Sequence, residues 1–118
     1  MRNIVAGNWK SNKLINEGQE LINEIAKGLP SLDSTDVIIA PPTPYLAHYS
    51  RNFVATNGIQ FAAQQCSANS MGAHTGEFTA SMLTSCGIQH VIIGHSERRD
   101  RFGENLDVVR AKVNEAIA

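Results

Sequence analysis

Side chains that could perform acid–base chemistry directly follow an apolar run. Residues 91–93 are all valine or isoleucine, and Gly94, His95 and Glu97 come after them. A run this apolar is typical of a strand buried on both faces, as in a parallel sheet covered by helices. Ligands of α/β proteins bind beyond the carboxyl ends of such strands, so His95 and Glu97 are expected to face a site. A histidine with no second signal nearby would more often be an ordinary packed side chain.

A second stretch at the N-terminus has the same design. Residues 4–6 are apolar, and Gly7, Asn8 and Lys10 follow them. Because parallel strands end at the same edge of a sheet, we expect Lys10 to approach His95. An ammonium group in that place attracts a phosphate or a developing oxyanion. Without such a partner, Lys10 would be a solvated surface residue.

Predicted strands and helices alternate along the rest of the chain. Strands are expected near residues 3–7, 37–40, 59–64 and 90–93, and helices near 16–29, 45–51, 81–86 and 106–117, with Asn16, Thr79 and Asn105 as N-caps. Alternation at roughly 30 residues per unit predicts a parallel sheet with right-handed crossovers. Four such units amount to half of an eight-unit barrel. We therefore expect an α/β fold, a (β/α)4 half-barrel with outer helices, in a single domain over residues 1–118.

The pattern also predicts which side chains are buried. If Lys10 and His95 point into the site, alternation along the strands turns a set of apolar residues toward the inside of the barrel: Ile4, Ala6, Val91 and Ile93. The last helix is expected to pack through one apolar stripe: Leu106, Val109, Val113, Ala116 and Ile117. Residues 65–78 have little apolar periodicity and are predicted to form a long loop, which in a compact domain usually has a function.

Composition excludes several classes of protein. The net charge of −1 and the scattered basic residues give no footprint for nucleic acid or for an anionic membrane. No apolar run approaches the length of a membrane span and no secretory signal precedes the first strand, so we expect a cytoplasmic protein. Cys66 and Cys86 lack the spacing of a metal or redox motif and are expected to be free thiols, with no metal and no cofactor.

Several motifs together resemble the triosephosphate isomerase family. Two of them contain the residues discussed above: Gly7-Asn8-Trp9-Lys10 and Gly94-His95-Ser96-Glu97-Arg98-Arg99. Four more fall in the same order: Ala40-Pro41-Pro42, Ala62-Ala63-Gln64, Gly72-Ala73-His74-Thr75-Gly76-Glu77 and Phe102-Gly103-Glu104. Each is weak alone, but the ordered set is specific and runs from Ile4 to about Ile117. A complete barrel of this kind has roughly 250 residues, so the resemblance covers its N-terminal half.

The resemblance implies the interconversion of dihydroxyacetone phosphate and glyceraldehyde 3-phosphate, in glycolysis and gluconeogenesis. It implies that His95, Lys10 and Glu97 are catalytic, with His95 bonded to the substrate oxygens and Glu97 paired with the lysine. Asn8 and Lys10 would contact the substrate. The family's catalytic base and its glycine-rich phosphate loops belong to the other half of the barrel and match no residue here. We therefore expect the chain alone to be inactive or nearly so.

The resemblance also implies an oligomer. In the family, the long loop inserts beside the lysine of a partner subunit, which makes Thr75, Gly76 and Glu77 the expected contact. Ser11 is smaller than the apolar residue usual at its position and would pack that loop less well. A half-barrel further leaves two sheet edges uncovered, so we expect a homo-oligomer, a dimer that closes a barrel. The alternative to an enzyme is a catalytically silent (β/α)4 module that folds and self-associates.

Overall fold

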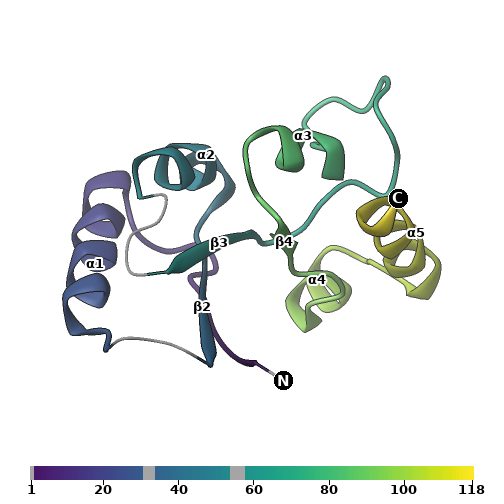
Figure 1. Ribbon diagram of the computed structural model, residues 1–118. Coiled ribbons are helices and arrows are strands. Elements are labelled where there is room, and N and C mark those ends of the chain that lie inside the picture. The colour runs from purple at the N-terminus through teal and green to yellow at the C-terminus, as the bar shows by residue number, and fades with distance from the viewer. Residues whose placement is uncertain (1, 31–33, 54–57) are drawn as a thin grey trace.

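The structure, a computed structural model, describes residues 2–30, 34–53 and 58–118. Its strands and helices alternate along the chain (Figure 1): β1 (Asn3–Asn8), α1 (Ile15–Gly28), β2 (Thr35–Ala40), α2 (Thr43–Asn52), β3 (Ile59–Ala63), α3 (Ala80–Ser85), β4 (His90–Val91), α4 (Ser96–Arg101) and α5 (Leu106–Ile117). The four strands form one sheet in the order β1-β2-β3-β4, and each neighbouring pair is parallel. The predicted (β/α)4 half-barrel is confirmed.

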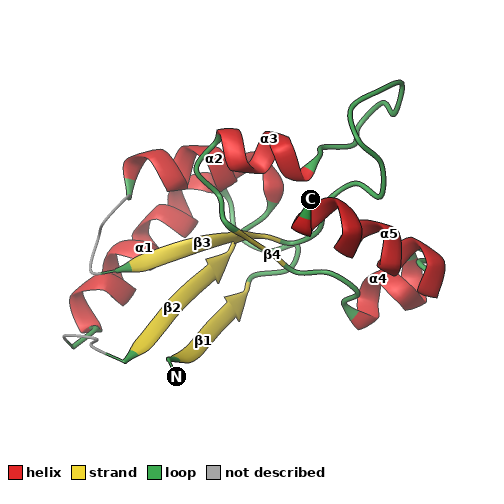
Figure 2. Cartoon of the chain, turned by 45° about the vertical axis from the view of Figure 1, so that its right-hand side comes forward, coloured by secondary structure: helices red, strands yellow, loops and turns green. Residues whose placement is uncertain are grey.

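Helices α1, α2 and α3 lie together on one side of the sheet (Figure 2). Tyr49 of α2 is fully buried at the centre of this layer, and its hydroxyl donates a hydrogen bond of 2.7 Å to the carbonyl of Ile15. The core between sheet and helices includes Ile22, Ala26, Val37, Ile39, Leu46, Phe61 and Ala63. Alternation along β2 and β3 thus sends every second side chain toward the helices. No helix within the described residues is long and apolar enough to cross a membrane.

The other face of the sheet carries a smaller apolar cluster of Ile38, Ala40 and Ala62, against which Ile92 packs. The register pairs Ala6 with Ile38, so Ala6 shares this inner face, as predicted. The prediction for Val91 and Ile93 is wrong, because both pack against the helix-side core. Gly94, with φ of +74°, turns the chain before His95, so alternation counted back from His95 does not apply to the strand.

The predicted core stripe of α5 is wrong for Leu106, Val113 and Ile117, which are exposed. Leu106 is 71% exposed and Ile117 is 77% exposed, whereas Lys112 is buried at 4% exposure. The helix packs through Lys112, which the stripe omitted, and through Val109, which lies 3.2 Å from the place a Cβ on Gly94 would occupy. The contacts of Lys112 and Val109 in the folded chain, and not the apolar pattern of the sequence, therefore decide which side of α5 is buried.

Two of the three predicted helix caps are confirmed. The Thr79 and Asn105 side chains accept hydrogen bonds from Met82 and Val108, at the starts of α3 and α5. Asn16 is not a cap, because α1 begins one residue earlier. There the Glu17 carboxylate accepts the amide N–H of Leu14 at 3.0 Å, which satisfies a donor that the helix itself leaves unpaired.

Candidate active site

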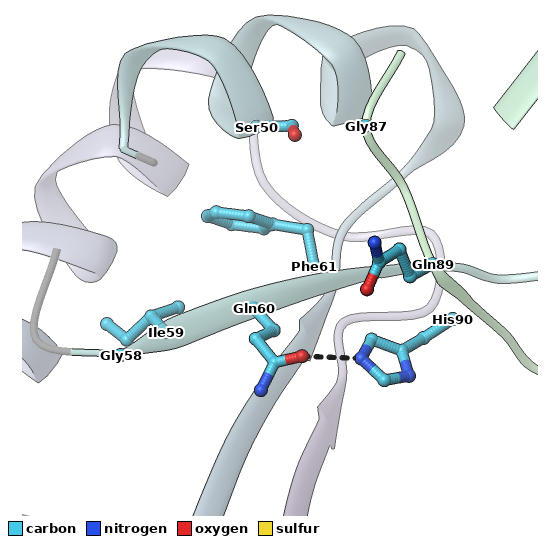
Figure 3. Close-up of a pocket in the computed structure, with 8 residues that line it drawn as sticks. All are labelled: Ser50, Gly58, Ile59, Gln60, Phe61, Gly87, Gln89 and His90. Carbon is cyan, nitrogen blue, oxygen red and sulfur yellow. Dashed lines mark hydrogen bonds between the residues drawn. The ribbon is translucent and has the colours of Figure 1, made fainter. Parts of the chain in front are cut away.

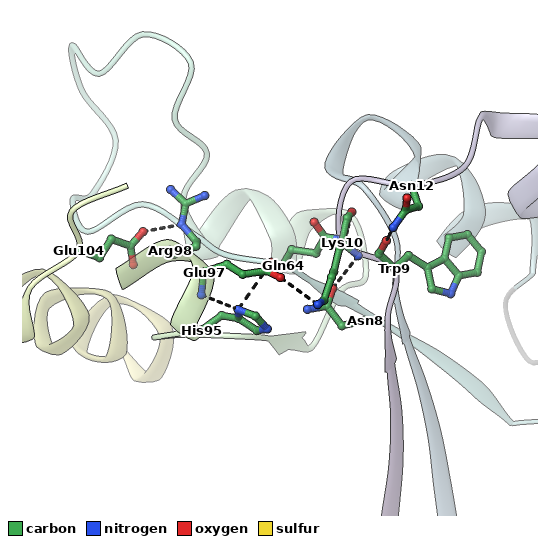
Figure 4. Close-up of polar contacts among 9 residues, drawn as sticks. All are labelled: Asn8, Trp9, Lys10, Asn12, Gln64, His95, Glu97, Arg98 and Glu104. Atoms are coloured by element: carbon green, nitrogen blue, oxygen red, sulfur yellow. Dashed lines mark hydrogen bonds and ion pairs between the residues drawn. The ribbon is translucent and has the colours of Figure 1, made fainter. Parts of the chain in front are cut away.

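One cavity lies at the carboxyl ends of the strands and has a volume of about 250 Å³. Its lining comes from segments that are far apart in the sequence: Asn8, Lys10, Ser11, Thr43, Gln64, Gln65, His95, Glu97, Arg98 and Phe102. Figure 4 shows the polar contacts among residues of this region. The structure thus brings together the four site residues predicted from the sequence, which are Asn8, Lys10, His95 and Glu97.

Lys10 has an unusual backbone conformation for a residue with a side chain. Its φ is +56°, in the left-handed region that costs such residues about 1–2 kcal/mol. The Asn8 side-chain oxygen accepts the Lys10 amide N–H at 2.9 Å. From this position the Lys10 ammonium reaches across the cavity and pairs with the Glu97 carboxylate, with 2.9 Å between Nζ and Oε1.

His95 is the N-cap residue of α4, and its ring orientation follows from that position. Nδ1 accepts the backbone N–H of Glu97 at 3.1 Å. A ring nitrogen that accepts a hydrogen bond carries no proton, so this contact favours the tautomer with the proton on Nε2. From Nε2, His95 can donate a hydrogen bond to an oxygen of a ligand.

Glu97 is held in its ionised form. The hydrogen bond from the Lys10 ammonium lowers the pKa of the Glu97 carboxyl, and the charge of Lys10 acts in the same direction. An ionised carboxylate accepts hydrogen bonds but donates none, so at neutral pH Glu97 has no proton to give. Its carboxylate lies 2.9 Å from Lys10 Nζ, which suits it to hold the Lys10 ammonium in place.

A buried ionic network adjoins the cavity and was not predicted from the sequence. The Glu104 carboxylate accepts hydrogen bonds of 2.5 Å from both Arg98 and Lys112, and Lys112 also donates to Gln65 at 3.1 Å. Burial by itself would raise the pKa of Glu104, but the hydrogen bonds from Lys112 and Arg98 outweigh it and lower that pKa. The sequence did contain a signal for the burial of Lys112, because it lies three residues after Val109 and therefore on the same side of the helix.

Gln64 is a further residue that sequence reasoning missed. It directly follows β3, and its side-chain nitrogen donates hydrogen bonds to the carbonyls of Lys10 and Ala40. The motif Ala62-Ala63-Gln64 marked the segment, but nothing in the pattern predicted a side chain bonded to two other strand ends.

The residues expected to contact a partner subunit lie apart from this cavity lining. Thr75, Gly76 and Glu77 are exposed in the long loop, where Glu77 N–H donates to the His74 carbonyl at 3.0 Å. Gly76 has φ of +90°, which a glycine adopts without strain. The loop therefore presents an ordered turn on the surface of the chain.

A second cavity, of about 350 Å³, lies at the amino ends of β3 and β4 (Figure 3). Its polar groups include Gln89 and a pair of side chains joined at 2.6 Å, Gln60 Oε1 and His90 Nε2. None of the described residues that line it is a lysine, an arginine or a carboxylate. The cavity at the carboxyl ends, where charged groups converge, is the stronger candidate for chemistry.

Within the described part of the chain, no three His, Cys, Asp or Glu residues are grouped so that they could hold a metal ion.

Comparison with known families matches residues 3–118 to one of them, Triosephosphate isomerase. Among curated proteins, the triosephosphate isomerase of Stenotrophomonas maltophilia is 44% identical over 111 residues, which cover 94% of this chain and 43% of that protein. Those of Gluconacetobacter diazotrophicus and Aquifex aeolicus are 40% and 37% identical, over 100% and 96% of this chain and 48% and 45% of their own lengths. The chain thus spans less than half the length of these relatives.

Proposed function

The chain belongs to the triosephosphate isomerase family, and from this premise we propose that its site handles a triose phosphate. The reaction is the interconversion of dihydroxyacetone phosphate and glyceraldehyde 3-phosphate, a cytoplasmic step of glycolysis and gluconeogenesis. In this proposal Lys10, His95 and Glu97 are catalytic, and Asn8 with Lys10 contacts the substrate. The reaction needs no metal and no cofactor.

The observation that supports the proposal best is the meeting of an ammonium and an imidazole N–H donor at one cavity. Lys10 and His95 both line it, and the hydrogen bond from the Glu97 backbone keeps the His95 proton on Nε2. When a proton leaves the carbon beside a carbonyl, negative charge develops on the carbonyl oxygen. A cation and an N–H donor fixed near that oxygen stabilise the charge, which is the largest contribution in many enzymes.

The residues that line the cavity do not include a good base for that carbon-bound proton. Among the described residues of the lining, Glu97 is the one carboxylate, and its bond to Lys10 lowers its pKa and its basicity together. General acid–base catalysis typically contributes about 10²–10⁴-fold to a rate. We therefore propose that these 118 residues supply the half of the site that polarises the carbonyl, and that alone they do not isomerise triose phosphates measurably.

A coupled isomerase assay tests this proposal. The purified chain alone should match a Lys10→Ala control, because both lack an effective base. Mixed with the remaining part of the Stenotrophomonas maltophilia relative, the unchanged chain should give activity that the Lys10→Ala chain does not give. A robust rate from the chain alone that disappears in Lys10→Ala would contradict the missing base and point to Glu97.

Binding is measured separately from turnover. Dihydroxyacetone phosphate, added to the chain alone, should shift the NMR signals of Lys10 and His95, with weak affinity because one ammonium holds only part of the ligand. The same titration on Lys10→Ala should leave the His95 signals unchanged. Shifts confined to the cavity around Gln60 and His90 would show that the site is misassigned.

The alternative, a silent module that self-associates, is favoured by the exposure of β1. Ile4 and Val5 face opposite sides of the sheet, and both are largely exposed, at 64% and 60%, so neither face of β1 is covered. We propose that the 118-residue chain by itself forms a dimer in which β1 of each copy meets β4 of the other. A contact through Thr75, Gly76 and Glu77 is the competing arrangement, and a variant at each surface separates the two.

A further inference from the structure

The Lys10 ammonium acts from a loop, and a loop needs anchors to hold a charge in place. The anchor at its start is the amide N–H of Trp9, which donates to the Ala40 carbonyl at 3.0 Å. The Asn8 side chain, at the last residue of β1, holds the Lys10 amide N–H, but this bond does not hold the Lys10 carbonyl. The left-handed backbone of Lys10 therefore calls for a further contact from outside the loop.

Gln64 makes that contact. Its side-chain nitrogen has two hydrogens, and it has two acceptors: the Lys10 carbonyl at 2.8 Å and the Ala40 carbonyl at 2.9 Å. One amide group at the end of β3 thus joins the segment after β1 to the end of β2. Figure 4 shows Gln64 beside Lys10, between it and the His95 side of the site.

The conformation of Lys10 decides where its side chain leaves the backbone. Its ammonium meets Glu97 at 2.9 Å even though the two side chains are 52% and 42% exposed. An exposed pair of flexible side chains keeps such a geometry only when their starting points are fixed, because side-chain entropy opposes the contact. A change of φ at Lys10 would send the side chain in another direction and break the pair.

We propose that Gln64 is a positioning residue for the isomerase site, holding Lys10 in its left-handed conformation so that the ammonium faces Glu97 and the substrate. This inference rests on the proposed function for its catalytic meaning. The competing explanation is that Gln64 only stabilises the ends of three strands. The two differ in whether the loss of Gln64 disturbs the contact between Lys10 and Glu97.

The test follows the Glu97 carboxyl by carbon-13 NMR during a pH titration of the 118-residue chain. In the unchanged chain, Glu97 should titrate below its usual range because Lys10 bonds to it. Lys10→Ala should raise the Glu97 pKa, and Gln64→Met, which keeps the shape but removes both donors, should reproduce most of that rise. The matched control is Gln60→Met. Gln60 lies within β3, the strand that Gln64 follows, and is also half-buried, but it bonds to His90, so its loss should leave the Glu97 titration unchanged.

A thermal unfolding curve for each variant separates positioning from stability. If Gln64→Met lowers the melting temperature but leaves the Glu97 titration as it was, the proposal is overturned. Gln64 is only half-buried, and the Ala40 carbonyl keeps its hydrogen bond from the Trp9 amide N–H, so the variants should fold. Gln64→Asn, one methylene shorter, is the milder second variant, and an unchanged Glu97 titration in it also overturns the proposal.

Activity in the mixed assay gives an independent readout. Gln64→Met should lower kcat about 10- to 100-fold, as expected for a misplaced catalytic group, with a smaller change in KM. Gln60→Met should keep the activity of the unchanged chain. If no mixture is active, the proposed function fails, while the Glu97 titration still decides whether Gln64 positions Lys10.

Discussion

At the scale of single residues, Glu104 lies at the centre of a buried ionic network. Its side chain is 6% exposed, that of Lys112 is 5% exposed, and Arg98 completes the network. A buried ion pair contributes little net stability by itself, but removing one member leaves an uncompensated buried charge. The network also joins Arg98 of the cavity lining to α5, so it links the site to the last helix.

We expect Glu104→Gln to destabilise the chain by about 3–5 kcal/mol, because it leaves the Lys112 ammonium buried without a counter-charge. Urea unfolding measures the change. Asp36→Asn is the control, since it removes an exposed pair with Arg2, and it should cost about 0–1 kcal/mol. Adding Lys112→Met to Glu104→Gln should recover most of the loss. Equal effects of Glu104→Gln and Asp36→Asn would show that the burial of the network is unimportant.

Stability should also depend on pH through Glu104. Its pKa in the folded chain is lowered from the usual 4.5, so unfolding takes up a proton as the pH approaches that value. The stability contributed by Glu104 is fully present above the unfolded pKa and is lost as the pH falls through the lower, folded pKa. Urea midpoints measured between pH 7 and pH 3 should fall below about pH 4.5. This acid loss should be smaller in the variant that combines Glu104→Gln with Lys112→Met.

At the scale of elements, α1 sits close to α2 because Gly18 has no side chain. A Cβ at Gly18 would lie 2.3 Å from the Tyr49 hydroxyl and 2.8 Å from a ring carbon of Trp9. The same Tyr49 hydroxyl bonds to the carbonyl of Ile15, one turn before Gly18. Gly18 therefore allows the aromatic side chain of α2 to reach the backbone of α1, and the close approach outweighs the low helix propensity of glycine.

Gly18→Ala and Gly28→Ala form a matched pair on α1. Gly18→Ala should destabilise the chain by about 1–3 kcal/mol, because the new methyl group overlaps the Tyr49 hydroxyl. Gly28 has no atom within 4 Å of a built Cβ, so Gly28→Ala should stabilise the chain by up to about 1 kcal/mol. Thermal unfolding by circular dichroism compares the two. A stabilising Gly18→Ala would mean that α1 and α2 are farther apart than described.

At the scale of the whole molecule, the sheet is covered unevenly. Strands β2 and β3 are buried, whereas β1 is an edge strand whose apolar side chains are exposed on both faces. A free apolar edge is a template for pairing with another strand, and no proline or inward-pointing charge within β1 blocks it. The inner cavity, lined by Ala6, Ile38 and Ile117 among others, has about 470 Å³ of space that a partner strand could help to fill.

Ile4→Lys should weaken the self-association of the 118-residue chain at least about tenfold, equivalent to about 1.4 kcal/mol, because it places a charge on the β1 edge. Met71→Lys alters the long loop at a site of similar exposure, 67% against 64%, and should leave association unchanged. Sedimentation velocity at several concentrations measures both. The opposite pattern would indicate a dimer joined through the loop, and a folded monomer at micromolar concentration in the unchanged chain would refute the association.

Local patterns were enough to predict the four strands and the helices apart from α4, and to place the candidate site residues at the carboxyl ends of the strands. Apolar runs that end in glycine and polar residues predicted the strands that carry Lys10 and His95, because side chains after parallel strands meet at one edge. Thr79 and Asn105 were predicted as caps from chemistry within three residues. These features depend on interactions close in sequence, so they can be inferred without the fold.

Tertiary contacts decided the features that the patterns missed. Val91 faces the helices because its register with Ala63 sets its direction, and the turn at Gly94 separates that direction from His95. Lys112 is buried because its ammonium bonds to Glu104 and Gln65, which lie 8 and 47 residues away in the sequence. Gln64 reaches Lys10 across 54 residues of chain. The sequence alone determined which residues end the strands. Only the folded sheet decided which groups meet there, because hydrogen bonds and ion pairs between distant segments depend on three-dimensional distances. The periodicity of a short stretch of sequence carries no information about those distances.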